Sequence, residues 1–231
     1  MDTAMINNNV DAAKLCGSGD NTGNKRIQSK PVYDFIKRII DIVCSLLGII
    51  LLSPFFIIIS IIIKTTSKGP VFFVHKRVGK NGKEIGIYKF RSMVVNAEQL
   101  LDTLTEEQKE EFRRNFKLEN DPRITKVGNI LRKTSLDELP QLFNILKGDI
   151  SIIGPRPVVE AEIKFYGNYK DLLLSVKPGL TGFWAANGRS DTSYKRRRAM
   201  EIYYVKNRSL LFDFKIFFKT FVSVFKGEGA K

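Results

Sequence analysis

Hydrophobic and polar positions divide the N-terminal part of the chain into two contrasting stretches. Residues 1–30 are rich in Asn, Asp, Gly, Thr and Ser and show little apolar periodicity, as is typical of a flexible polar leader. An apolar run then extends from Ile39 to Ile63 and is the only long one in the sequence. We therefore divide the chain into a leader (1–30), a membrane-associated segment (31–68) and a folded domain (69–231).

A proline stands in the middle of the apolar run. As one straight helix the run would reach about 37 Å, enough to cross a hydrocarbon core of about 30 Å. Pro54 lacks an N–H group and clashes with the preceding turn, so we expect a kink or a break near Ser53 and Pro54 that leaves arms of roughly 21 and 14 Å. Neither arm is long enough to span the membrane alone.

The charges on both sides of the run support the same interpretation. Lys37 and Arg38 precede it and Lys64 and Lys68 follow it, whereas a spanning segment normally carries its basic residues on one side. We predict a re-entrant helix-break-helix hairpin with both ends at the cytoplasmic face. Ser53 would satisfy part of the backbone freed at the break, and Asp41 would stay at headgroup depth. A single kinked spanning helix is the alternative, because proline is common in membrane helices.

Beyond residue 68 the pattern changes to short β-type and helical segments. Apolar, β-favouring stretches flank the turn-forming Gly-Lys-Asn-Gly at 79–82, which predicts a β-hairpin. Residues 94–118 predict a charged amphipathic helical region, and apolar spacing from Leu139 to Leu146 predicts a helix that ends at Gly148. Residues 208–227 mix phenylalanine with lysine, as in a membrane-interface helix, and a core helix is the alternative. The predicted fold class is α+β, mostly helical.

Net charge restricts the class of partner. Lys and Arg number 38 against 24 Asp and Glu, which gives a formal net charge of +14. The partner is therefore anionic: a nucleic acid, a phosphorylated substrate or an acidic bilayer face. The sequence contains no helix-turn-helix, zinc-finger or RNP-like motif, so we do not expect a nucleic acid.

Cysteine and histidine are too few for several kinds of site. Cys16 lies in the polar leader and Cys44 in the apolar run, so neither a disulfide framework nor a metal cluster is expected. His75 is the only histidine, which excludes multi-histidine zinc sites. Its position beside Lys76 and Arg77 indicates an ordinary strand or loop residue.

Two adjacent carboxylates carry the candidate chemistry. Asp137 and Glu138 occur in the stretch SLDELPQL, and adjacent residues on a helix point about 100° apart. They therefore suit two roles, in which one approaches an electrophile and the other holds a metal ion. The alternative is structural, because Ser135-x-x-Glu138 matches a capping box. Pro140 complicates that alternative, since proline fits best at the first helical position.

Basic residues on either side of these acids favour a phosphate-binding site. Arg132 precedes the acids, and Arg156 follows them, held between two prolines that leave its loop little entropy to lose. Lys89 and Arg91 in YKFRSM and Arg189 in NGRSD supply further cations. Arginine grips phosphate through two hydrogen bonds at once.

The motifs containing these residues resemble one known family. The series SKGPVFFVHKRVG, YKFRSM, NDPRITKVG, LRKTSLDELPQLFNILKGDISIIGPRP, KPGLTGFWAANGRSD and EIYYVKNRSLLFDFKIFFKT is similar to the bacterial sugar transferases, over residues 33–228 and in family order. These are monotopic phosphoglycosyl transferases that act on polyprenyl phosphate. The resemblance implies transfer of a sugar 1-phosphate from a UDP-sugar to undecaprenyl phosphate at the cytoplasmic face of the bacterial inner membrane, with Mg²⁺ and release of UMP. Such a transfer begins exopolysaccharide, capsule or O-antigen synthesis.

The resemblance also implies roles for individual residues. Asp137 matches the nucleophile, which forms a covalent aspartyl phosphosugar, and Glu138 its partner and metal ligand, while Arg132 and Arg156 match basic residues near the phosphates. The family's membrane element is likewise a helix broken at Ser-Pro. Glu201 and Asp191 are further candidate ligands, and Glu201 departs from the family pattern because relatives commonly carry Asp at this position.

Several questions stay open at this level. The four extra membrane spans of longer members are absent, so the chain resembles a minimal catalytic unit. Family frequency favours glucose or galactose as the sugar, and anionic lipid is expected to attract the basic flanks. A homo-oligomer is compatible with the sequence. The alternative function is a basic, membrane-attached binding or scaffold protein without catalysis.

Overall fold

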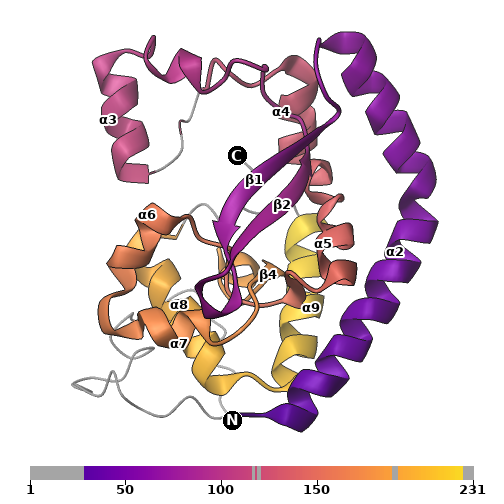
Figure 1. Ribbon diagram of the computed structural model, residues 1–231, viewed down its shortest axis with the longest axis vertical. Coiled ribbons are helices and arrows are strands. Elements are labelled where there is room, and N and C mark those ends of the chain that lie inside the picture. Colours follow the sequence, from indigo (N-terminus) through magenta and orange to yellow (C-terminus); the bar gives the residue numbers. More distant parts are fainter. Residues whose placement is uncertain (1–28, 116–117, 119–120, 189–191, 226–231) are drawn as a thin grey trace.

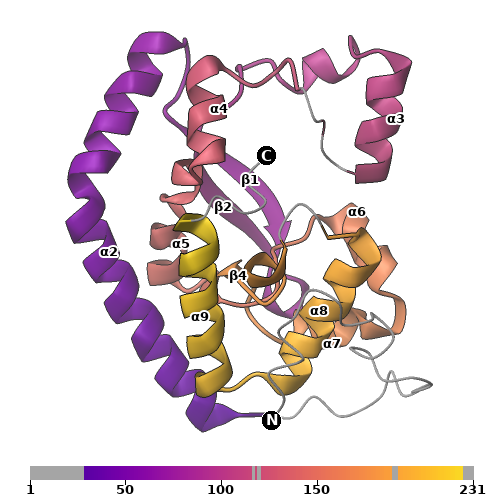
Figure 2. The same ribbon diagram turned by 180° about the vertical axis from the view of Figure 1, so that it is seen from behind.

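The computed structural model describes residues 29–115, 118, 121–188 and 192–225, so the predicted leader lies almost entirely outside the described residues. One long helix, α2 (Pro31–Thr66), runs along a whole side of the molecule. A β-hairpin lies between this helix and a group of shorter helices, α6 to α8 (Figures 1 and 2). The predicted α+β class, mostly helical with a small hairpin, is confirmed.

Helix α2 differs from the predicted helix-break-helix in one respect. It is continuous through Pro54, and it bows around the domain where two separate helices were expected (Figure 1). Pro54 has no N–H to donate to the carbonyl of Ile50, one turn earlier. The Ser53 hydroxyl donates to that carbonyl at 2.8 Å, which replaces the missing bond and lets the helix continue. The expected role of Ser53 is confirmed, whereas the expected gap in the helix is wrong.

Polar contacts attach the N-terminal half of α2 to the domain. Asp41 is buried and accepts hydrogen bonds from the Ser151 hydroxyl and the Ile152 amide, both at 3.0 Å. Asp41 thus joins α2 to β3, a role that the sequence did not predict, and its position at headgroup depth stays a prediction. Arg38 donates to the carbonyls of Ile145 and Leu146 at 2.6 and 2.7 Å, where the last carbonyls of a helix need partners.

A second attachment joins the start of α2 to helix α9 (Leu210–Phe225). The buried Asp213 carboxylate accepts from the Tyr33 and Tyr204 hydroxyls, each at 2.8 Å, and from Lys37 at 2.7 Å. Ile216 of the same helix is buried in the core, while Phe214 and Phe218 are exposed. Helix α9 thus has one buried and one exposed apolar face.

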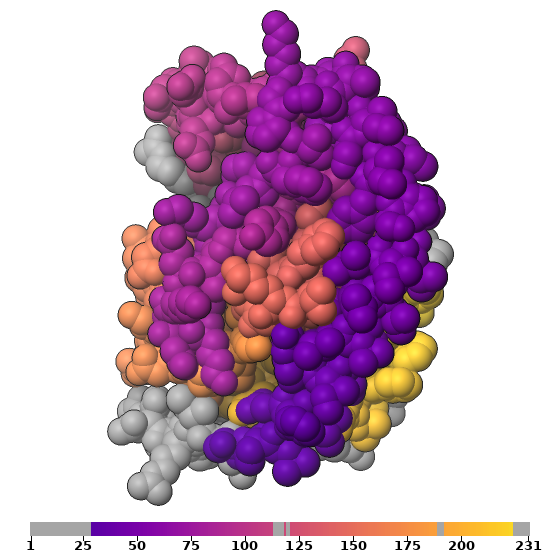
Figure 3. Space-filling model, turned by 45° about the vertical axis from the view of Figure 1, so that its right-hand side comes forward, coloured from indigo at the N-terminus to yellow at the C-terminus, as the bar shows by residue number. Residues whose placement is uncertain are grey.

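The apolar side chains of α2 follow the same division. Ile59 and Ile63 are buried against Phe90 and Leu131, whereas much of the opposite face is exposed, with Leu51 at 72%. Figure 3 shows α2 in indigo packed against α5 (Gln141–Lys147), with the hairpin on the other side of α5. By length and composition α2 is the one helix in the described residues able to cross a membrane.

Two small sheets support the site. Strands β1 (Phe72–Val78) and β2 (Glu84–Phe90) pair antiparallel, as predicted, around a turn in which Asn81 and Gly82 have positive φ. Strands β3 (Ser151–Ile153) and β4 (Gly179–Thr181) pair in parallel, which the sequence pattern did not predict.

The remaining elements are short helices, except for α8. The predicted helical region at 94–118 contains η3 (Gln99–Leu101) and α3 (Glu106–Asn115), and Gly148, with φ of 92°, ends α5 as predicted. The others are η2 (Lys80–Gly82), α4 (Lys126–Lys133), η4 (Leu136–Glu138), α6 (Glu160–Ile163), η5 (Lys164–Tyr169), α7 (Lys170–Leu174), η6 (Ala185–Asn187) and α8 (Tyr194–Asn207).

Candidate active site

Ser92 fixes α4 against the end of the hairpin. Its carbonyl accepts from the Thr125 amide at 3.0 Å, and the Thr125 hydroxyl caps α4 at the amide of Gly128. A Cβ atom on Gly128 would lie 1.9 Å from the Ser92 carbonyl oxygen, so only glycine permits this approach. The Ser92 hydroxyl then accepts from Arg132 Nε at 2.8 Å, which fixes the guanidinium at the end of α4 that leads to the two acids.

The chain turns sharply between α4 and the acidic pair. Ser135 adopts a left-handed conformation with φ of 58°, which is uncommon for a residue with a side chain. Its side chain makes no capping hydrogen bond to η4, so the capping-box alternative is wrong. Backbone strain of this kind gathers at functional sites. The turn buries Asp137 and leaves Glu138 partly exposed.

Lys89 of β2 connects the two carboxylates. Its ammonium lies 2.7 Å from Glu138 Oε1 and 3.9 Å from Asp137 Oδ2. Asn144 of α5 holds this part of β2 in place: it accepts from the Tyr88 amide at 2.8 Å and donates to the Gly86 carbonyl at 2.7 Å. Asn144 is fully buried, so these bonds fix the strand that carries Lys89 next to the acids.

Burial and the neighbouring cations act in opposite directions on the pKa of Asp137. Burial, with a smaller contribution from Glu138, raises the pKa of its carboxyl from 3.8 to about 6, against the attraction of Lys89 and Arg132. The group is therefore ionised at neutral pH but holds its charge in a poorly solvated place. A carboxylate of that kind is a better nucleophile than one surrounded by water. Burial also lowers the pKa of Arg132, which stays a cation at neutral pH.

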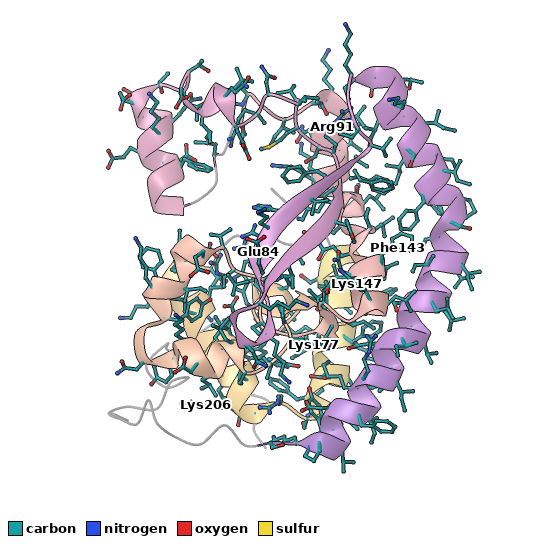
Figure 4. The ribbon with its side chains drawn as sticks, in the orientation of Figure 1. Glu84, Arg91, Phe143, Lys147, Lys177 and Lys206 are labelled. Carbon is teal, nitrogen blue, oxygen red and sulfur yellow. The ribbon has the colours of Figure 1, made fainter. Side chains whose placement is uncertain are left out.

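Arg91 bonds to the segment that follows α2. Its guanidinium donates to the Lys68 carbonyl at 2.7 Å and to the carbonyl and hydroxyl of Ser67 at 2.9 and 2.7 Å. Figure 4 places it at the end of the hairpin next to the end of α2. Arg91 thus anchors the chain where α2 ends, and its guanidinium is engaged there instead of at the predicted phosphate site.

Arg156 is presented by a loop that glycines hold close to β4. Gly154 donates to the Thr181 carbonyl at 2.9 Å, and Gly179 donates to the Pro155 carbonyl at 2.8 Å. A Cβ atom on Gly179 would lie 2.1 Å from the Gly154 nitrogen. The sequences GPRP and KPGLTG are therefore two halves of one backbone contact, which sets the position of Arg156.

Arg156 belongs to a mixed cluster of cations, acids and aromatic rings. Its Nη1 lies 3.8 Å from the buried Glu162 carboxylate, to which Arg197 also points, at 3.5 Å. Both guanidinium groups lie over the Trp184 ring, at 5.9 and 5.3 Å from its centroid. Arg77 relates this cluster to the dyad formed by Asp137 and Glu138, because the charges of both Arg156 and Glu138 act on the pKa of Arg77.

The other predicted residues have different surroundings. Glu201 is fully buried in α8, accepts a hydrogen bond from the Tyr166 hydroxyl, and has its pKa raised by burial. It thus lies in the core beside Arg197. Arg189 and Asp191 lie outside the described residues.

Sequence reasoning missed several members of the site. Arg77, Glu162 and Arg197 were not proposed, and His75 was interpreted as an ordinary strand or loop residue. The strand period contained a usable signal: His75 and Arg77 alternate with Val74, Lys76 and Val78, so both point to one side of β1. No comparable signal identified Glu162 or Arg197, which meet only in the folded chain.

The donor atoms present suit Mg²⁺ held jointly with a substrate. In the described part of the chain no three His, Cys, Asp or Glu side chains gather at one point. Mg²⁺ usually binds through one or two carboxylates together with substrate phosphates. The Glu138 side chain is 37% exposed, with a second carboxylate at the adjacent residue, so the two acids fit that mode of binding.

Comparisons with known proteins identify the family of the chain. The family described as bacterial sugar transferase matches residues 32–227. The undecaprenyl-phosphate galactose phosphotransferase of Salmonella typhimurium is 47% identical over 85% of this chain, which covers 42% of that relative. The exopolysaccharide production protein ExoY of Sinorhizobium fredii is 43% identical over 87% of this chain and 90% of its own length.

A third relative carries a different sugar in its name. The UDP-glucose:undecaprenyl-phosphate glucose-1-phosphate transferase of Escherichia coli K12 is 40% identical over 85% of this chain. This chain spans 43% of that protein, so it covers less than half of the glucose and galactose transferases and most of ExoY. With the family match extending over most of its length, the chain belongs to the bacterial sugar transferase family.

Proposed function

We propose that the protein transfers a sugar 1-phosphate from a UDP-sugar to undecaprenyl phosphate and releases UMP. The reaction would begin exopolysaccharide, capsule or O-antigen synthesis, and the sugar would be glucose or galactose, as in the names of two relatives. The observation that carries the proposal is the buried Asp137 carboxylate, held beside Lys89 and Arg132 and adjacent to Glu138.

The transfer takes two displacement steps at one phosphorus atom. An oxygen of Asp137 attacks the sugar-bearing phosphorus of the donor, and the bond from that phosphorus to the bridging oxygen breaks, so that UMP leaves with the electron pair. An oxygen of undecaprenyl phosphate then attacks the same phosphorus and releases the Asp137 carboxylate. The water-soluble donor and the membrane-held acceptor therefore need not be bound together.

Cations make the approach of two anions feasible. Lys89 and Arg132 lie beside the nucleophile, and Arg156 is held in a stiff loop near enough to Arg77 for its charge to lower the pKa of Arg77. Fixed positive groups of this kind stabilise the charge that develops on the phosphoryl oxygens. Mg²⁺, bound by Glu138 and the donor phosphates, would neutralise further charge.

The exposed apolar faces of α2 and α9 support a position at the membrane. Both helices keep apolar side chains exposed on one face, for example Ile57 and Phe221, while polar groups attach them to the domain on the other. We propose that α2 enters the cytoplasmic leaflet of the inner membrane without crossing it, and that α9 lies in the interface. Lys64 and Lys68 would then meet anionic headgroups.

A covalent adduct tests the mechanism. Incubation with UDP-sugar and Mg²⁺ without lipid acceptor should release about one UMP per active site and leave a phosphosugar on the peptide that contains Asp137. UMP formation without an adduct would indicate direct transfer in a ternary complex. Failure to release UMP from every donor in a broad panel would favour the alternative, a basic membrane-attached binding or scaffold protein.

A further inference from the structure

One face of the hairpin leads from the acidic pair to the arginine cluster. Phe73, His75 and Arg77 alternate along β1, so their side chains share a face, and we call these three residues the β1 strip. Phe73 pairs directly with Lys89, which bonds Glu138 and lies 3.9 Å from Asp137. The β1 strip therefore starts beside the nucleophile and ends at Arg77.

The hydrogen bond between Arg77 and His75 determines which ring nitrogen of His75 carries the proton. Arg77 Nη2 lies 3.3 Å from His75 Nδ1, and arginine can only donate, so Nδ1 accepts and the proton is on Nε2. Burial and the positive charges of Arg77, Lys89 and Arg156 lower the pKa of His75 to about 4. At neutral pH His75 is thus an uncharged ring that offers one N–H donor.

The surroundings indicate what this donor would contact. Lys89, Arg77 and Arg156 already supply cations for phosphate oxygens, to which an uncharged donor adds little. Phe73 is 47% exposed and packs edge-on against the imidazole, with ring centroids 5.7 Å apart. An aromatic face next to a single neutral donor suits a sugar ring, which has apolar C–H faces and hydroxyl oxygens.

We propose that Phe73 and His75 form the subsite for the sugar of the donor, and that His75 Nε2–H donates to one sugar hydroxyl oxygen. The inference rests on the proposed function and adds to it the residues that distinguish one sugar from another. In this arrangement the phosphate that carries the sugar lies at Lys89, between the sugar on the β1 strip and the carboxylate of Asp137. The nucleotide phosphate extends toward Arg77 and Arg156.

Donor analogues that each lack one sugar hydroxyl provide the sharpest test of the proposed subsite. The full chain is purified in detergent, its best UDP-sugar is found by UMP release, and kcat/KM is measured for the monodeoxy analogues of that donor. The wild-type protein should disfavour one analogue by about 10- to 100-fold, because the removed hydroxyl leaves the His75 donor unpaired. In His75→Phe the same analogue should react about as well as the parent donor, and kcat/KM for the parent should fall by a similar factor.

Three further variants and one inhibitor separate a role of His75 in sugar binding from a role in phosphate binding. His75→Gln keeps an N–H donor at a similar distance from the backbone and should retain most of the discrimination against the deoxy analogue. His75→Leu removes the donor without an aromatic ring and should behave like His75→Phe. Lys76→Gln, on the opposite face of β1, has an exposed side chain and should change nothing. UDP has the base and both phosphates but no sugar, so its inhibition constant should be the same in all four variants.

The outcomes separate this inference from the proposed function. If His75→Phe and His75→Leu still discriminate against every deoxy analogue as the wild type does, the inference is overturned. It is also overturned if they weaken UDP binding as much as they weaken kcat/KM, because His75 would then serve the phosphates. If the wild-type protein releases no UMP from any donor, the proposed function fails, and this inference falls with it.

Discussion

Replacing Asp137 with asparagine should abolish catalysis and at the same time stabilise the folded protein at neutral pH. The asparagine side chain has the same size but no negative charge, so burying it does not remove a charge from water. A pKa that rises from 3.8 to about 6 on folding means that the ionised Asp137 costs the folded state about 3 kcal/mol, at about 1.4 kcal/mol per unit. The Asn variant avoids that cost, so about 3 kcal/mol is the upper limit for its gain in the free energy of unfolding.

The pH dependence has a definite sign. Because the folded-state pKa is the higher one, the folded protein binds more protons than the unfolded chain between about pH 4 and pH 6. The cost of the carboxylate is therefore absent below about pH 4, grows through this window, and is complete above about pH 6. The stability gained by Asp137→Asn should follow the same course and be about half as large at pH 5.

Thermal unfolding in detergent measures the effect. For a chain of this size, about 3 kcal/mol corresponds to an increase of about 6–12 °C in Tm at pH 7.5. The increase should shrink steadily as the pH is lowered to 4, and the variant should form neither adduct nor product. Glu138→Gln, which alters the adjacent, partly exposed carboxylate, is the matched control and should not reproduce the increase. A lower Tm for Asp137→Asn at pH 7.5 would show that its carboxylate stabilises the fold, and would refute the reasoning.

Three further changes test other parts of the structure. Glu138→Gln should slow the first step by roughly 10²–10⁴ without preventing a slow adduct, as measured by UMP release and mass spectrometry. Asn144→Ala removes two buried hydrogen bonds to β2 and should cost about 2–3 kcal/mol, seen as a lower Tm. Cysteines placed near Lys30 and Lys68 should both react with a label added from the cytoplasmic side. In Pro54→Leu, α2 should cross the bilayer in part of the population. Unchanged labelling in that variant would show that the proline does not decide topology.

Elements governed by local rules were predictable from the sequence. The hairpin turn needs residues that accept positive φ, and Asn81 and Gly82 occur where the sequence pattern placed the turn. Gly148 ends α5 for the same reason, at a φ of 92°. The parallel pair β3 and β4 was not predictable, because each strand has three residues and the pairing rests on contacts between distant glycines.

Charged residues with distant partners were the hardest to place. Asp41 and Arg91 look like solvent-facing or ligand-facing groups in the sequence, yet their hydrogen bonds join them to backbone and serine hydroxyl groups of other segments. A buried charge must find such partners, and nothing in the local sequence specifies which ones. Lys89 was placed correctly among the basic groups near the acids, although its direct bond to Glu138 was not foreseen.

The contacts of α2 link the proposed membrane attachment to the geometry of Asp137 and Glu138. Its N-terminal half is held by Asp41 at β3 and by Arg38 at the end of α5, while its C-terminal half packs under Leu131 and the loop that carries the acids. Ser53 and Pro54 lie between these two attachments, where a bow lets one helix follow the curved side of the domain (Figure 1). A straight helix could keep one attachment but would strain the other. Because the second attachment includes Leu136 and Leu139, on either side of the two acids, α2 is part of the scaffold that holds Asp137 in place.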